Sequence, residues 1–311
     1  MSEKGPRPER GVLEVLGAAV LFGTTGTTAS FAPPGAGSVA IGSARLVVGG
    51  TGLFLALPLL GGRRRTALAL WRGPWGFTAG LMTALYQLGF FAGVALAGVA
   101  LGTLVTIGTG PILVGLLSWL LLGERPALTW WLSTAVCVTG LVLLTLDGSG
   151  QSGIHVGGLV LSVVAAAGYA FYTVAAKRLM NRGAHAPEVM ASAFTLGGIV
   201  LFPVLLLAGA SWMATLRGLV VALWLGLGTT TVAYFLFGRG LRVLPAGPVA
   251  TLVLAEPLVA TLLGVGVLGE RLGPVGWLGA ALVATGLALQ GVTAVRGRAD
   301  TPQNVVEGAL A

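Results

Sequence analysis

An acidic residue lies inside a long apolar run of the sequence and is directly followed by proline. The pair is Glu256-Pro257, in the run 246–268. Proline lacks a backbone N–H and disturbs the carbonyl group four residues earlier, here that of Val253, so a helix should kink or open there. Burying a charge in a membrane costs about 2.5–3.5 kcal/mol, which makes Glu256 a candidate for the wall of a ligand cavity or for proton exchange. The alternative is a neutral carboxylic acid bonded to a neighbouring helix.

One basic residue is also embedded in an apolar run, Arg45 within 38–60. Its guanidinium group could attract a carboxylate-bearing ligand or pair with Glu256. Equally, the long side chain could extend to the lipid headgroups at the nearer membrane surface.

Tyrosine, glutamine and threonine side chains gather on particular faces of the expected helices, because residues three or four positions apart are neighbours on a helix. A cavity lined by such groups suits an amphipathic small molecule. Each residue alone also has a structural interpretation, since threonine often bonds a carbonyl of its own helix and tyrosine anchors at membrane interfaces. The candidates of this kind are Thr25, Tyr86, Gln87, Tyr169, Tyr172 and Tyr234.

Residues needed for several other functions are missing. The sequence has no G-x-x-x-x-G-K-[ST] phosphate-binding loop, and both histidines, His155 and His185, fall in loops. We therefore expect no ATP-driven pump, no enzyme, no metal site and no cofactor. The net charge of +8 does not indicate a nucleic-acid partner, because the basic residues lie between the apolar runs.

The composition excludes a water-soluble fold. The chain of 311 residues is 55% hydrophobic and 9% charged, whereas soluble domains carry about 25% charged residues. A helix that crosses a bilayer needs roughly 20 apolar residues. We expect an all-α integral membrane protein with ten transmembrane helices, at 11–31, 38–60, 75–97, 101–122, 127–146, 157–178, 189–209, 217–238, 246–268 and 274–294. The helices 127–146 and 274–294 carry few polar groups and are expected to be scaffold or lipid-facing.

The ten runs form two related sets of five. LGTLVTIGTGPILVGLLSWLLLGER (101–125) is echoed by GPVATLVLAEPLVATLLGVGVLGER (247–271), with an offset of 146 positions that aligns Pro111 with Pro257. We expect repeats at 11–146 and 157–294 with a Gly/Ser-rich linker between them, and a helix break at each of these prolines. Since five is odd, the repeats must cross the membrane in opposite directions. Inverted repeats are typical of secondary transporters with a midplane substrate site.

The distribution of Lys and Arg predicts the orientation. With the N-terminus inside, 15 of the 18 basic residues face the cytoplasm, Arg217 and Arg271 lie outside, and Arg45 lies within the membrane. Both tails, 1–10 and 295–311, are therefore expected to be cytoplasmic, the latter disordered, in a protein of the plasma membrane.

With these features the chain resembles the drug/metabolite transporter superfamily, in its ten-helix EamA branch. The likeness is carried by GPILVGLLSWLLLGER and EPLVATLLGVGVLGER, and by Phe22-Gly23, Arg45, Tyr169-Ala170 and Lys177-Arg178. It implies a basket of ten helices around a central cavity and transport by alternating access. The chain departs from a common pattern because Ala29 to Phe31 stand where many members have a lysine near the end of the first helix.

We expect a secondary transporter that exports small metabolites, with amino acids, related amphipathic compounds or drugs as substrates and protons as candidate coupling ions. An importer or exchanger of organic anions would depend on Arg45. A membrane sensor or channel that transports nothing is the alternative from another class. The oligomeric state stays open.

Overall fold

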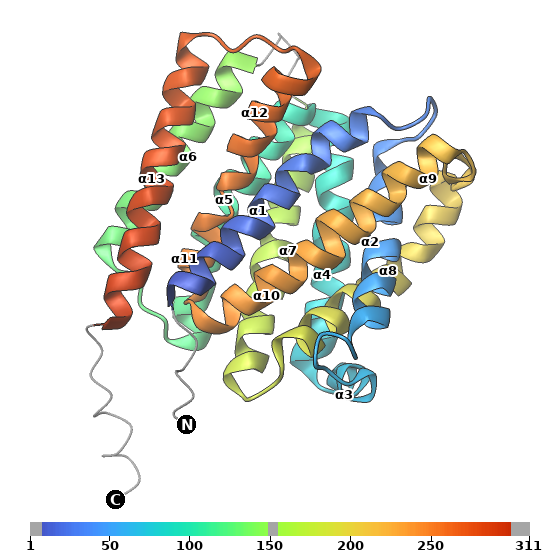
Figure 1. The fold of residues 1–311 in the computed structure, drawn as a ribbon, viewed down its shortest axis with the longest axis horizontal. Helices are drawn as coiled ribbons and strands as arrows, with labels where there is room; N and C mark the ends of the chain where they lie inside the picture. Colours follow the sequence, from blue (N-terminus) through green and yellow to red (C-terminus); the bar gives the residue numbers. More distant parts are fainter. Residues whose placement is uncertain (1–7, 149–154, 300–311) are drawn as a thin grey trace, which may run out of the picture.

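The structure, a computed structural model, describes residues 8–148 and 155–299. In this part of the chain ten helical spans are long and apolar enough to cross a membrane, and every regular element is helical (Figure 1). The predicted all-α membrane fold is confirmed. The tails 1–7 and 300–311 and most of the predicted linker lie outside the described residues.

The first five spans follow the predicted runs closely. They are α1 (Pro8–Ser30), α2 (Ser38–Ala56), α4 (Pro74–Ala97), α5 (Val99–Leu122) and α6 (Leu128–Gly148). The connector between the second and third spans, predicted to be a loop, folds into the short helices α3 (Arg64–Ala69) and η1 (Leu70–Arg72).

The second five spans differ more from the predicted ones. The sixth and seventh spans are single helices, α7 (Val156–Asn181) and α8 (Ala186–Ala208). The short helix η2 (Ser211–Ala214) follows them. The eighth span consists of α9 (Leu216–Leu223), a π-helical segment η3 (Trp224–Val232) and α10 (Ala233–Val243); the ninth of α11 (Ala246–Leu252) and α12 (Ala255–Leu268). The last, α13 (Pro274–Ala299), continues beyond its predicted end at 294.

The two halves run in opposite directions. The helix α1 begins and α13 ends at the same end of the bundle, which we call the terminal end (Figure 1). The turn after α5 lies at the terminal end, whereas the equivalent turn after α12 lies at the opposite end (Figure 1). The glycine-terminated turns that carry Arg125 and Arg271 are therefore on opposite sides of the bundle.

The helices α6 and α13, which end the two halves, pack side by side through glycines (Figure 1). A Cβ atom added at Gly140 would lie 2.6 Å from the carbonyl oxygen of Gly279, and one added at Gly286 would lie 2.9 Å from that of Ser133. The 146-residue offset relates Gly140 to Gly286 and Ser133 to Gly279. The same contact thus occurs twice with exchanged roles, as two-fold pseudo-symmetry requires.

Two charged side chains, the buried Lys177 and the half-buried Glu124, hold the turn between α10 and α11 at the terminal end. The Nζ atom of Lys177 donates hydrogen bonds to the carbonyl oxygens of Leu241 and Leu244, each at 2.8 Å. Glu124 Oε2 accepts a hydrogen bond from the backbone N–H of Ala246, also at 2.8 Å. Partial burial raises the pKa of Glu124, against the lowering effects of the Ala246 N–H and the Lys177 charge. In the other half the position equivalent to Lys177 is Phe31, which cannot donate such bonds.

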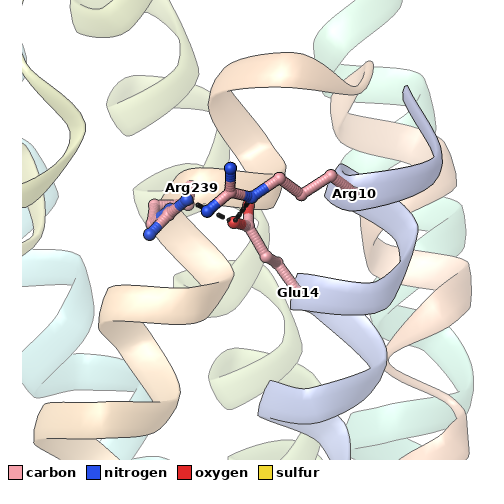
Figure 2. A network of polar contacts seen from close by, with 3 residues as sticks. All are labelled: Arg10, Glu14 and Arg239. Carbon is pink, nitrogen blue, oxygen red and sulfur yellow. Dashed lines mark hydrogen bonds and ion pairs between the residues drawn. The ribbon is translucent and has the colours of Figure 1, made fainter. Parts of the chain in front are cut away.

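A second polar contact at this end joins the two halves through α1 and α10. Glu14 Oε1 accepts from Arg10 Nε at 3.2 Å and from Arg239 Nη2 at 2.7 Å (Figure 2). The eighth span was predicted to end at 238 but continues to Val243, so Arg239 lies inside α10 and not in the following loop. Sequence reasoning missed Glu14, although Arg10 four residues earlier was an available signal.

We predict that Gly140→Ala lowers the free energy of unfolding by about 1–3 kcal/mol, because the added methyl group meets backbone atoms of α13 that cannot move alone. The matched control is Gly26→Ala in α1, where a Cβ atom meets nothing within 4 Å. It should raise stability by about 0.5–1 kcal/mol. Thermal unfolding in detergent micelles measures both; equal unfolding temperatures for the two variants would contradict the close approach of α6 and α13.

We predict that Lys177→Met lowers the free energy of unfolding by about 1.5–3 kcal/mol, since the carbonyl groups of Leu241 and Leu244 lose a charged donor. Arg182→Met, on an exposed position one turn further along, is the control and should change little. The same thermal assay applies. If both variants lost a similar amount of stability, the loss would be due to removal of a positive charge and not to the hydrogen bonds with the α10–α11 turn.

Candidate functional site

All four tyrosines of the chain lie in one buried cluster, to which both halves contribute. Tyr86 comes from α4, Tyr169 and Tyr172 from α7, and Tyr234 from α10. The ring centroids are 5.6 Å apart for Tyr86 and Tyr169, 5.4 Å for Tyr169 and Tyr172, and 6.4 Å for Tyr172 and Tyr234. These separations are those of mutually attractive aromatic pairs. The four predicted tyrosines are thus brought together, which their separation in the sequence did not guarantee.

Two phenylalanines pack against this tyrosine cluster. Phe194 of α8 lies 3.9 Å from Tyr234 and Phe22 of α1 lies 4.8 Å from it, measured between ring centroids. Sequence reasoning did not include either residue in the site, since phenylalanine in a membrane span carries no signal that separates a site from a packing contact.

Glu256 borders the tyrosine cluster across a small cavity. The cavity has a volume of about 20 Å³, enough for about one water molecule. The structure therefore describes a state that is closed around the site. The lining residues come from α4, α5, α7 and the junction of α11 with α12: Tyr86, Thr106, Ile107, Gly110, Pro111, Tyr169, Ala250, Val253 and Glu256.

The chain leaves the helical path beside Glu256. The carbonyl oxygen of Val253 accepts from the N–H of Glu256 at 2.8 Å, because Pro257 has no N–H to offer it. Pro257 then lies in the first turn of α12, where donors have no helical partner in any case. At Pro111, by contrast, the predicted break is absent: α5 is continuous from Val99 to Leu122. One missing donor is not enough to interrupt a helix of 24 residues.

Arg45 is buried in α2 with 5% of its surface exposed, which disfavours the alternative in which its side chain extends to the lipid headgroups. Its Nε atom donates to Thr229 Oγ1 and its Nη2 atom to the Thr229 carbonyl oxygen, each at 3.1 Å. Although both side chains are in the described part of the chain, Arg45 and Glu256 form no contact ion pair.

The partner of Arg45 lies in the π-helical segment η3, which the sequence analysis missed. Thr231 of the same segment donates through Oγ1 to the carbonyl oxygen of Gly49 in α2, at 3.1 Å. The available signal was LGLGTTT (225–231), two glycines followed by three threonines. π-Helical segments are rare and occur frequently at functional sites.

The remaining predicted site residues differ in whether their side chains form hydrogen bonds. Gln87 donates through Nε2 to the carbonyl oxygen of Gly42 at 3.0 Å, so it ties α4 to α2. The hydroxyl groups of Thr25, Tyr169 and Tyr172 are buried without a hydrogen-bond partner of normal geometry. Such groups cost about 1–3 kcal/mol each, and they mark places where a ligand or water is expected.

Comparison with known proteins places this architecture in a family. The EamA-like transporter family matches residues 9–146 and 156–291 of the chain, one domain in each half. The uncharacterized transporter YwfM of Bacillus subtilis (strain 168) is 41% identical over 276 residues, which cover 88% of this chain and 91% of that protein. The putative permease-like protein YdzE of the same organism is 37% identical over 67 residues, 22% of this chain and 86% of that protein.

A solved crystal structure shares the fold. It aligns with a TM-score of 0.77 over 94% of this chain and 99% of that chain, at 21% sequence identity. The two matched domains, the ten spans and the inverted halves agree with one another. The chain is therefore a membrane transporter that belongs to the EamA-like transporter family.

Proposed function

We propose that this transporter exports small metabolites by alternating access, and that amino acids or related amphipathic compounds are its substrates. The observation that carries the proposal is the tyrosine cluster beside Glu256, buried where the two inverted halves meet. Transporters built from inverted repeats bind their substrates at such an interface near the bilayer midplane.

The chemistry of the site favours a substrate with an ammonium group and an apolar part. Tyrosine faces attract cations, and the Glu256 carboxylate supplies the balancing charge. The buried hydroxyl groups of Thr25, Tyr169 and Tyr172, which lack hydrogen bonds of normal geometry, offer donors and acceptors for the other polar end of such a molecule. An exchanger of organic anions would first need to release Arg45 from Thr229, which makes it the weaker hypothesis.

The proposed orientation in the membrane and the proposed proton coupling rest on charged residues. The Lys and Arg distribution supports a plasma-membrane protein whose terminal end faces the cytoplasm. Opening toward the cytoplasm then requires movement of the α10–α11 turn, which Lys177 and Glu124 hold in the closed state. Glu256 is the proposed proton carrier: its carboxyl group releases its proton to the surrounding water when the ammonium group of the substrate binds there. The two halves, 11–146 and 157–294, are the proposed moving units.

We predict that Glu256→Gln lowers the rate of saturable amino-acid counterflow at least about tenfold, a change equivalent to 1.4 kcal/mol. Glutamine keeps the size of the side chain but removes its charge and its proton. Uptake of a radiolabelled amino-acid panel into proteoliposomes, measured across pH, is the assay. Glu270→Gln, in the exposed turn after α12, is the matched control. A Glu256→Gln protein with the wild-type rate and pH dependence would remove Glu256 from the mechanism.

We predict that Tyr169→Phe separates stability from transport. The change removes a buried hydroxyl group that has no hydrogen-bond partner of normal geometry, so the unfolding temperature should change little. If that hydroxyl group bonds the substrate, KM for the transported amino acid should rise roughly fivefold, about 1 kcal/mol. A lower unfolding temperature with an unchanged KM would assign the hydroxyl group to packing instead.

A further inference from the structure

A second cavity, here called the large cavity, lies at the terminal end of the bundle. Its volume is about 500 Å³, within the range of about 300–1,000 Å³ that is usual for small-molecule sites. Its wall includes the exposed residues Arg125, Asn181 and Pro245, whereas Gly115 and Gly247, which also line it, are buried. The large cavity therefore opens to the surface at the terminal end and reaches into the interior of the bundle.

The large cavity and the small cavity beside Glu256 follow one another along the same two helices. On α5, Gly115 lines the large cavity and Pro111 lines the small one. On α11, Pro248 lines the large cavity and Ala250 lines the small one. A step of four residues (115 − 111) along a helix covers about 6 Å, so about one helical turn of α5 separates the two cavities.

The helices α5 and α11 approach each other closely at this level, and Trp130 of α6 covers the contact. A Cβ atom added at Gly247 would lie 3.6 Å from the Cα atom of Gly115 and 3.1 Å from Nε1 of Trp130. One added at Gly115 would overlap the six-membered part of the indole ring. Trp130 is 3% exposed and belongs to the wall of the large cavity. Its ring therefore packs across both glycines, one from each half of the chain, at the inner end of this cavity.

A hydrogen bond joins α6 to α11 one turn beyond Trp130. The hydroxyl oxygens of Thr134 and Thr251 lie 2.8 Å apart, and both side chains are buried. Trp130 and Thr134 are four positions apart and so lie on one face of α6, which is the face that contacts α11. The α10–α11 turn, which the charged side chains described above hold in place, directly precedes Gly247. Movement of this turn would draw Gly247 away from the ring of Trp130.

The repeat does not require this arrangement. The position equivalent to Trp130 in the other half is Gly276, and the positions equivalent to Gly115 and Gly247 are Thr261 and Leu101. The packing of an indole ring across two glycines is thus specific to the terminal end.

We propose that the large cavity is the terminal-end entrance of the substrate pathway, and that Trp130 is the gate between this entrance and the site beside Glu256. The gate opens when α11 moves away from α6 and the indole ring loses its contact with Gly247. The use of this route by a substrate rests on the proposed function, whereas the control of access by Trp130 does not.

The test measures whether Trp130 controls access to a thiol in the wall of the small cavity. Val253→Cys places the thiol there, in the full-length protein whose one native cysteine is removed by Cys137→Ala. A membrane-impermeant methanethiosulfonate reagent with a trimethylammonium group is added to one side of vesicles that contain the protein, and mass spectrometry gives the labelling rate. Arg125→Cys and Arg271→Cys, each as the single cysteine of the protein, identify the end of the bundle that faces the reagent.

We expect labelling from the terminal end to become at least about tenfold faster in Trp130→Ala, because truncation leaves a cavity where the ring was. Trp130→Phe keeps an aromatic ring in a packed core and should accelerate labelling about threefold. Trp131→Ala, at the exposed neighbouring position, is the matched control and should leave the rate unchanged. Labelling from the opposite end should be the same in all three variants.

The inference is overturned if neither Trp130 variant accelerates labelling from the terminal end, or if Trp131→Ala accelerates it as much. Equal acceleration from both ends also overturns it, since that result indicates a general loosening of the fold. If Trp130→Ala does not fold, Trp130→Phe decides between the same outcomes. Amino-acid counterflow without any effect of Trp130 on labelling overturns this inference alone. Labelling that Trp130 controls, in a protein that transports nothing, overturns only the proposed function.

Discussion

A lipid bilayer offers no hydrogen bonds to a polypeptide backbone, and this constraint organises the structure. Chain that leaves the regular helix can exist at membrane depth only where other protein groups cover it. The two irregular segments within spans satisfy this rule differently: Arg45 and Thr231 bond η3 to α2, whereas Val253 bonds the N–H of Glu256. Both segments lie where the two halves meet. The tyrosine cluster and Glu256 lie in the same region.

The packing of α6 against α13 follows the symmetry of the repeat, whereas the residues of the candidate site do not. The glycine contacts between α6 and α13 occur in two equivalent copies. No tyrosine has a tyrosine at the equivalent position of the other half, and Gly110 stands opposite Glu256. Gly23, the counterpart of Tyr169, is needed for packing, since a Cβ atom there would lie 2.8 Å from the carbonyl oxygen of Glu256. At these two pairs of equivalent positions the second half therefore has Tyr169 and Glu256 where the first half has Gly23 and Gly110.

The features predictable from the sequence were those with a local cause. Ten spans follow from apolar length, the inverted halves from an offset of 146 positions, and the interruption beside Glu256 from the missing N–H of Pro257. The partners of Arg45 and Gln87 could not be predicted, because they lie on helices far away in the sequence. The large cavity could not be predicted for the same reason. Trp130 and Gln290 lie in helices that were expected to be scaffold or lipid-facing. Only the packing of α6 and α13 against the α10–α11 turn places these residues in the cavity wall.

The restriction of every tyrosine to one cluster has a spectroscopic consequence. Growth on fluorinated tyrosine would introduce four fluorine nuclei, all of them within the region where substrate is proposed to bind. Each resonance would then report on local ring environment without background from the surface or the tails. A transporter of this composition carries its own set of magnetic resonance probes, with no engineered cysteine or dye.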